Sequence, residues 1–172
     1  WDSEEASEFA ECRVKARVLS HVQPEFQLLE TLLWEPGSGY FLFEEHLQRL
    51  AQSAAYFGRP VDLEAVRRHL GACVDGLPPL PHRVRLLVAN DGTAATQCQP
   101  VAVPDRPPRI CLARTPVNTA DVFLYHKTTA RDVYEKALAA CPGMDDVLLW
   151  NERGEITEST IANVVVALDG AL

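Results

Sequence analysis

Apolar residues recur with helical spacing in four stretches of the chain. Within each stretch they lie three or four positions apart, which gathers them on one face of an amphipathic helix. The last stretch starts with Lys127 near the apolar stripe and ends before Pro142, which cannot continue a helix. We therefore predict helices over residues 3–20, 44–57, 62–74 and 127–141.

Other segments alternate apolar and polar residues, or carry a short apolar run bounded by turn residues, which is typical of strands. Turns at residues 35–39 and 90–92 predict two hairpins, and a turn at residues 153–154 predicts a third. Glu158 follows this third turn. The expected strands cover residues 26–34, 40–43, 83–88, 96–103, 110–113, 146–150 and 164–168.

This order of elements predicts an α+β fold, in which an antiparallel sheet and two helices form an N-terminal domain. We place that domain at residues 25–113, a linker at 114–120 and a second domain at 121–172. A segment of about 50 residues is too small to bury a comfortable core of its own. We therefore interpret residues 121–172 as the first part of a larger domain.

The net charge, the apolar runs and the cysteine pattern limit which partners and which cellular location we expect. The formal net charge of −8 and the isoelectric point of about 5.1 disfavour nucleic acid and anionic membranes as partners, although a local basic pocket for a small anion remains possible. No apolar run reaches transmembrane length, and no signal peptide opens the chain. The five cysteines are widely spaced and show no zinc pattern, which is typical of a cytoplasmic protein with reduced thiols.

Local patterns give Lys127 two possible roles and give Arg49 and Glu158 an ordinary surface position. A cation in the first turn of a helix opposes the helix dipole, which favours the neutral amine of Lys127 and suits a Schiff-base nucleophile. Helical spacing alone favours instead a solvated lysine whose stem packs on the helix. By the same reasoning Arg49 is a surface arginine on its helix, and Glu158 is an exposed carboxylate at a strand end.

Arginines offer one further candidate site. Arg83, Arg85 and Arg131 could bind a small anion. Positions at a strand edge and on a helix surface are the simpler interpretation for all three.

Three motifs in the same order and spacing resemble a known family. The segments HLQRLAQSAAYFG, HKTTARDVY and EITES followed by AN are similar to the signature of the fold-type IV pyridoxal-phosphate enzymes, the class IV aminotransferases. The KTTAR and FQLLETLLW forms are most similar to 4-amino-4-deoxychorismate lyase. Residues 1–22 resemble the closing helix of the chorismate-binding component of aminodeoxychorismate synthase, behind which the lyase is fused in some family members.

The resemblance implies pyridoxal 5'-phosphate as the cofactor and assigns its main contacts. Lys127 would be the catalytic residue and would hold the cofactor covalently. Glu158 would pair with the pyridine nitrogen and keep the ring protonated, so that the ring accepts electrons. Arg49 would bind the cofactor phosphate, which requires its helix to turn a polar side into the cleft.

Other positions receive less specific roles from the resemblance. Arg131 and Tyr134 would contact the cofactor, although roles in substrate binding or packing remain open. Thr31 and His46 would contact the substrate. Asn163 fits the AN element and would support the strand that carries the glutamate.

The implied reaction is the release of pyruvate and p-aminobenzoate from 4-amino-4-deoxychorismate, a step of folate biosynthesis. An aminotransferase of D- or branched-chain amino acids uses the same residues, and a non-catalytic fragment or assembly module is the alternative from another class. The expected partners are a small-molecule substrate, a second copy in a homodimer and a fused or associated chorismate-binding synthase component. The chain stops before the family's second half, so we expect weak cofactor binding or none if the polypeptide ends at Leu172.

Overall fold

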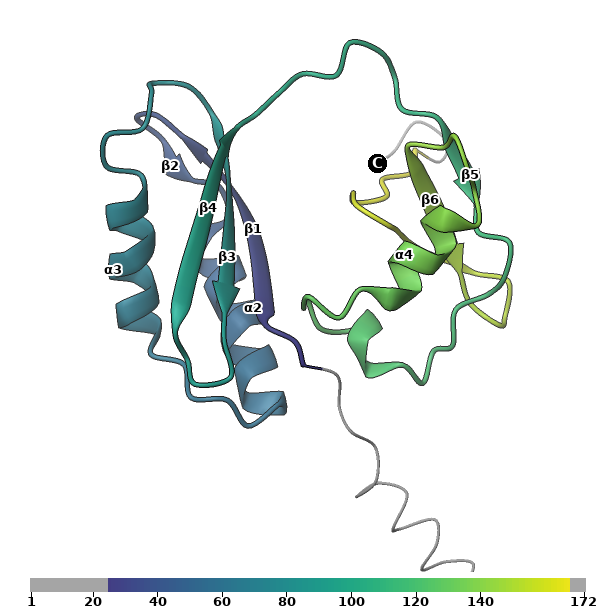
Figure 1. The fold of residues 1–172 in the computed structure, drawn as a ribbon, viewed down its shortest axis with the longest axis horizontal. Helices are drawn as coiled ribbons and strands as arrows, with labels where there is room; N and C mark the ends of the chain where they lie inside the picture. Colours follow the sequence, from purple (N-terminus) through teal and green to yellow (C-terminus); the bar gives the residue numbers. More distant parts are fainter. Residues whose placement is uncertain (1–24, 168–172) are drawn as a thin grey trace, which may run out of the picture.

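The computed structural model describes residues 25–167, which form two units, each with its own sheet (Figure 1). The first unit holds a four-stranded antiparallel sheet in the order β2-β1-β3-β4. Its strands are β1 (Leu28–Glu35), β2 (Gly39–Tyr40), β3 (His82–Val88) and β4 (Ala94–Pro100). Its helices are α2 (Phe43–Tyr56) and α3 (Leu63–Cys73).

The second unit holds a three-stranded sheet in the order β5-β6-β7. Its strands are β5 (Ile110–Leu112), β6 (Asp146–Trp150) and β7 (Ile156–Ser159). A short 3-10 helix, η1 (Val122–Leu124), and the helix α4 (Asp132–Ala139) complete it. In Figure 1 the segment between β4 and β5 crosses from one unit to the other.

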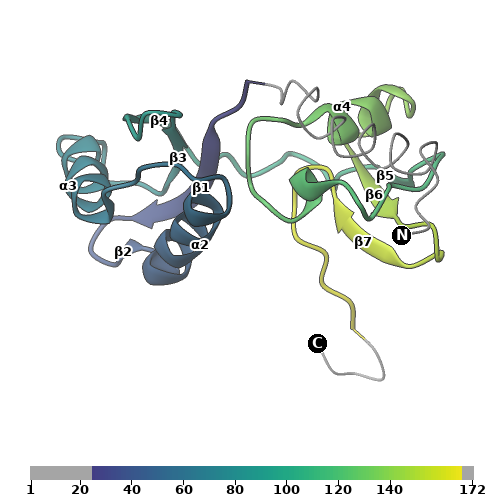
Figure 2. The ribbon, with the colours of Figure 1, turned by 90° about the horizontal axis from the view of Figure 1, so that it is seen from below.

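Alternation along the strands of the first sheet gives it one mainly apolar face, packed under the helices, and a second face that mixes leucines with Thr31, Arg83 and Arg85. On the apolar face, fully buried residues of β1 and β3 pack against α2 and α3, whose stripes fall at the predicted positions. This core includes Leu28, Leu32, Leu47, Leu50, Val66, Leu70, Val84 and Leu86. Figures 1 and 2 both show the second unit beside the face that the helices leave open.

The prediction of one helix over residues 127–141 is wrong at its start. The structure begins α4 at Asp132, and Thr128 instead forms an antiparallel bridge with Leu28 at the start of β1. Residues that exchange backbone hydrogen bonds with a strand have no free groups for a helical turn. A tertiary contact therefore overrides the helical periodicity over residues 127–131.

Two strand predictions also need correction. Residues 164–167 form no strand, while β7 occupies residues 156–159, so Glu158 lies within the returning strand and not beyond the hairpin. The valines at 164–166 favoured a strand by propensity, but they are exposed here and pair with no strand of the described residues. Residues 110–113, which the sequence assigned to the first domain, carry β5, which pairs with β6 in parallel in the second sheet.

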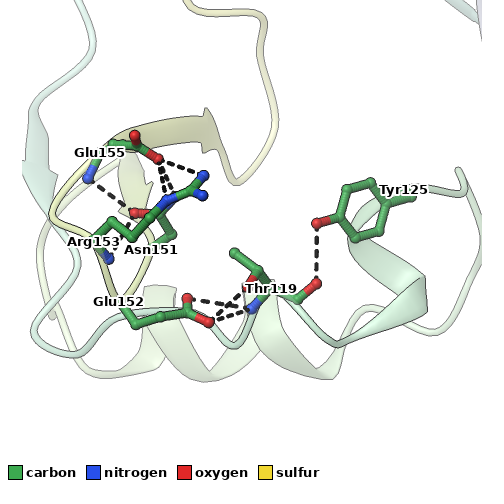
Figure 3. Close-up of polar contacts among 6 residues, drawn as sticks. All are labelled: Thr119, Tyr125, Asn151, Glu152, Arg153 and Glu155. Atoms are coloured by element: carbon green, nitrogen blue, oxygen red, sulfur yellow. Dashed lines mark hydrogen bonds and ion pairs between the residues drawn. The ribbon is translucent and has the colours of Figure 1, made fainter.

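The segment that leads to Lys127 is tied to the hairpin of β6 and β7 (Figure 3). In the hairpin turn, the Glu152 carboxylate accepts from Thr119 Oγ1 at 2.6 Å and from Thr119 N at 3.3 Å. Tyr125 Oη in turn donates to Thr119 O at 3.0 Å. Asn151 Oδ1 closes the turn by accepting from two backbone amides at 3.0 Å. These contacts fix the approach to the lysine relative to the strand of Glu158.

The predicted helix over residues 3–20, and with it the assignment of residues 1–22, lies outside the described residues. Within residues 25–167, every helix is too short or too polar to cross a membrane.

Gly92, in the turn between β3 and β4, supports a test of this packing. Its φ is +85°, and a Cβ added there would lie 2.2 Å from the carbonyl oxygen of Pro60. We expect Gly92→Ala to destabilise the fold by roughly 3–5 kcal/mol, because it adds a backbone clash to left-handed strain. Gly154→Ala is the matched control, since its φ is +79° with open space around it, and it should cost about 1–2 kcal/mol. Urea unfolding measures both, and equal losses would contradict the described turn contact.

Candidate active site

The backbone at Lys127 is fixed against the start of β1. Leu29 N donates to Lys127 O at 2.9 Å, and Thr129 N donates to Gln27 O at 2.9 Å. Gln27 N also donates to Thr129 Oγ1 at 2.9 Å. The second unit thereby presents its lysine at a defined position along the first sheet.

A buried carboxylate holds Arg49 at the edge of this site. Glu30, 1% exposed on the helix-facing side of β1, accepts from Arg49 Nε at Oε1 (2.8 Å) and from Arg49 Nη2 at Oε2. The same Oε2 is hydrogen-bonded to His46 Nδ1 at 2.8 Å. Burial raises the pKa of Glu30, but the hydrogen bonds from Arg49 and His46 outweigh burial and hold that pKa below its ordinary value. The paired carboxylate thus fixes the direction of the arginine fork.

The environment of Lys127 favours its neutral amine. Burial lowers the pKa of Lys127, and the positive charge of Arg49 lowers it further, against the opposing effect of Glu30. The sequence analysis attributed a lowered pKa of Lys127 to the dipole of its helix. That explanation is wrong, because α4 begins only at Asp132 and Lys127 lies outside it. His126 precedes the lysine and bonds Ser53 Oγ of α2 at 3.1 Å, which holds this loop against the helix of Arg49.

Glu158 faces the lysine from β7 within a small polar cluster. Its Oε1 accepts from Tyr134 Oη at 3.1 Å, and the Arg131 guanidinium stacks on the Tyr134 ring, 4.4 Å from its centroid. Burial raises the pKa of Glu158, while the hydrogen bond from Tyr134 and the charges of Arg131 and Lys127 oppose that rise. A cation placed against Glu158 would therefore lower the pKa of this carboxyl group and favour its ionised form.

A buried carboxylate of β6 holds the loop that follows β7. Asp146 is 4% exposed, and its Oδ1 accepts from Thr160 Oγ1 at 2.5 Å and from Thr160 N at 3.0 Å. Ser159 Oγ donates to Ala162 O at 2.8 Å, which tightens the turn. Arg131 donates to Thr160 O from the other side. The wall of the site is therefore rigid on this side.

Two neighbouring cavities, of about 340 and 190 Å³, share these groups. The larger extends over the open face of the first sheet to Thr31, Arg83 and Arg85. The smaller extends to Arg49 and His126. Residues that line both are Lys127, Arg131, Tyr134, Glu158 and Asn163.

The structure therefore brings together most of the residues named from the sequence. Thr31 lines the larger cavity, as does Lys127. His46 lines neither cavity and contacts the site through Glu30 and through Arg49 Nη2, which lies 3.2 Å from His46 Nδ1. Asn163, expected to support the glutamate strand, lies exposed at the rim of both cavities. Tyr56 is 63% exposed and packs on His126, with ring centroids 4.3 Å apart.

Sequence reasoning missed Glu30 and gave Arg83 and Arg85 too little weight. Glu30 is a lone carboxylate on a strand face that is otherwise leucine and tryptophan, and such a buried charge requires a partner. Arg83 and Arg85 alternate with buried valines and leucines, which points both arginines away from the core. The sequence shows both the lone carboxylate at Glu30 and the alternation at Arg83 and Arg85. It does not show that the second unit packs beside the face of the sheet that carries the two arginines.

Comparisons with known proteins define the family. The model of the amino-transferase class IV family matches residues 27–172. The chain belongs to the class IV aminotransferase family.

Relatives within this family differ in the activity that their names state. A Schizosaccharomyces pombe protein named as an aminodeoxychorismate lyase is 30% identical over 153 residues, which are 85% of this chain and 64% of that protein. A Mesorhizobium loti structure described as an amino-acid aminotransferase is 38% identical and has a TM-score of 0.72, with 80% of this chain and 68% of that chain covered. The 4-amino-4-deoxychorismate lyase of Pseudomonas aeruginosa is 20% identical with a TM-score of 0.63, covers 84% of this chain and 60% of its own, and shows the fold alone.

The described residues fit the pyridoxal phosphate that this family implies. A partly buried amine with a lowered pKa suits an aldehyde, a partly buried carboxylate suits a ring nitrogen, and a fixed guanidinium suits a phosphate. Lys127 and Glu158 line both cavities, and Arg49 lines one of them. No group of metal-binding side chains occurs among residues 25–167.

The charge of Arg49 predicts a measurable shift at Lys127. Arg49→Gln removes a neighbouring positive charge and releases the Glu30 carboxylate from its ion pair, and both changes should raise the pKa of Lys127. Reductive methylation with 13C followed by an NMR pH titration reads this pKa in a chain with three lysines. Arg68→Gln, an exposed change on α3, is the control for net charge. An unchanged or lowered pKa in Arg49→Gln would show that the arginine does not act on the lysine.

Proposed function

We propose that the protein is a pyridoxal-phosphate-dependent lyase that converts 4-amino-4-deoxychorismate to p-aminobenzoate and pyruvate. The observation that carries this proposal is that Lys127 and Glu158 both line the same two neighbouring cavities. The choice of lyase is supported by the name of the S. pombe relative. This reaction would place the protein in folate biosynthesis.

Three residues of the chain would hold the cofactor. Lys127 Nζ would attach to its aldehyde carbon, Glu158 would hold a proton on its ring nitrogen, and Arg49 would bind its phosphate. When bound, pyridoxal phosphate supplies an electron-accepting ring that stabilises negative charge on the substrate carbon next to the amine.

Lys127 also has the properties of the proton carrier in this reaction. After the substrate amine has taken its place, the free amine of Lys127 would remove the proton from the amine-bearing carbon, and the lowering of its pKa by burial and by Arg49 favours the neutral form that this role needs. The bond between the ring carbon and the ether oxygen then breaks, the ring becomes aromatic, and Lys127 returns the proton to the departing enolpyruvyl group. The backbone hydrogen bond between Lys127 and β1 fixes the base of this side chain, so the amine would act from a defined starting point.

An aminotransferase activity is the second candidate. The 38% identity to the M. loti aminotransferase favours it, and the same lysine and carboxylate serve both reactions. The two differ in products, since only the aminotransferase makes glutamate when supplied with an amino acid and 2-oxoglutarate. Glutamate formation without pyruvate release would favour this second function.

Substitution of Lys127 tests the lyase directly. In the full-length protein with pyridoxal phosphate, Lys127→Ala should lower the turnover of 4-amino-4-deoxychorismate by about 10²–10⁴-fold, because the amine that moves the proton is gone. Coupling pyruvate to lactate dehydrogenase measures the rate.

The control is Lys136→Ala, which removes an exposed lysine of α4 that pairs only with Asp132 on the same helix at 3.6 Å. Its turnover should match the wild type. Pyruvate release at the normal rate by Lys127→Ala would refute the assigned role of the lysine.

A further inference from the structure

Two cysteines that lie 25 positions apart in the sequence meet in the first unit. Cys73 is the last residue of α3, where it extends the stripe of Val66 and Leu70 that packs on the sheet. Cys98 lies in β4 as the register partner of the buried Val84, so it points to the side of the sheet that carries α3. The two sulfur atoms are 3.9 Å apart.

Contacts with neighbouring groups hold both thiols in place. Cys73 Sγ donates to Leu70 O at 3.2 Å and lies 3.4 Å from Tyr40 Oη. Tyr40 Oη donates to the same carbonyl at 2.8 Å. Cys98 Sγ lies 3.8 Å from Cys73 O. Both cysteines are free thiols and only partly buried, so a small oxidant in solution can reach them.

The pair is close to the geometry of a disulfide. A sulfur–sulfur bond is about 2.05 Å long, so the two sulfur atoms must approach each other by about 2 Å, which rotation of the two side chains can supply. The local backbone can also adjust. Cys73 ends its helix, and β4 is an edge strand of the order β2-β1-β3-β4.

We propose that Cys73 and Cys98 form a reversible disulfide when the protein meets a small-molecule disulfide such as oxidised glutathione. The Cys73 thiolate attacks one sulfur of the oxidant, which forms a mixed disulfide and releases one molecule of reduced thiol. The Cys98 thiolate then attacks the Cys73 sulfur and releases the second. Two protein thiols are oxidised, one oxidant disulfide is reduced to two thiols, and the two protein protons pass to the released thiolates.

The order of the two steps follows from the surroundings of Cys98. Burial and the neighbouring Cys73 raise the pKa of Cys98 to about 11, so we assign the first attack to Cys73. Once Cys73 carries the mixed disulfide, it has no charge left to oppose the Cys98 thiolate. The second attack is then intramolecular, which compensates for the small fraction of Cys98 that is ionised.

The bond would fasten the edge strand β4 to α3 on the helix side of the first sheet. Neither cysteine lines the two cavities that Lys127 and Glu158 share. Oxidation should therefore change the stability of the first unit and leave the candidate active site as it is. This inference is independent of the proposed function.

The wild-type protein is the first test. We would equilibrate it with mixtures of oxidised and reduced glutathione, alkylate the remaining thiols and map the digested peptides by mass spectrometry. The peptides of Cys73 and Cys98 should be joined. The equilibrium constant for this bond should be about 10²-fold larger in native protein than in protein unfolded by urea, because folding holds the two sulfurs together.

Thermal unfolding reads the same linkage from the other side. The cross-linked wild type should melt about 5 °C or more above the reduced protein. Cys98→Ser should keep glutathione on Cys73 as a mixed disulfide and show no such rise. Cys111→Ser, which removes a partly buried cysteine of β5 in the second unit, is the matched control and should form the bond as the wild type does. Circular dichroism verifies that each variant is folded.

The comparison of native with unfolded wild type needs no substitution, so it decides the matter even if a variant fails to fold. Equal equilibrium constants in the two states would refute the proposal. Glutathione on Cys73 and on Cys98 without a joined peptide would refute it as well, as would a cross-linked protein that melts no higher than the reduced one.

Discussion

The short backbone pairing between the start of β1 and the segment of Lys127 is the constraint on which the site depends. Through it, a loop of the second unit becomes an extension of the first sheet. Backbone hydrogen bonds fix position along a strand to within one residue. Side-chain contacts alone would leave a lysine with four rotatable bonds free to sweep the cavity. The pairing therefore specifies where the backbone of Lys127 lies and at which position along β1 its side chain starts.

Burial and charge act together once that position is set. Glu30 pairs with Arg49 from the helix side of β1, and the hydrogen bond raises the pKa of Arg49, so the arginine is fixed in its protonated form. The lysine loses solvent and gains a cationic neighbour, and both effects favour the neutral amine. Burial raises the pKa of Glu158 more than Tyr134, Arg131 and Lys127 lower it, so a cationic ring nitrogen would further stabilise its carboxylate. The three groups are complementary to one ligand with an aldehyde, a phosphate and a ring nitrogen.

Sequence reasoning succeeded where local physics decides the outcome. The apolar stripes of α2 and α3 and the turn at Gly92 follow from periodicity and backbone preferences, and the structure confirms them. It failed where a distant segment competes for the same backbone. The segment of Lys127 pairs with β1 and does not form the expected first helical turn, and β5 pairs with β6 of the second sheet. The contact of Glu30 with Arg49 and the burial of Arg85 Nε depend on how elements pack, which one-dimensional spacing does not encode.

The two faces of β1 make this strand a poor place for insertions and deletions. Its residues Leu28, Leu32 and Trp34 pack with the core under α2 and α3, while Leu29 and Thr31 line the larger cavity on the other face. Shifting the strand by one residue would bring the Glu30 carboxylate onto the face of Arg85 and leave Arg49 without its partner. A register shift of one residue would thus place a carboxylate beside Arg85 in the cavity and leave the charge of Arg49 unpaired on the helix side. Length in this strand is under tighter constraint than the identity of any single leucine within it.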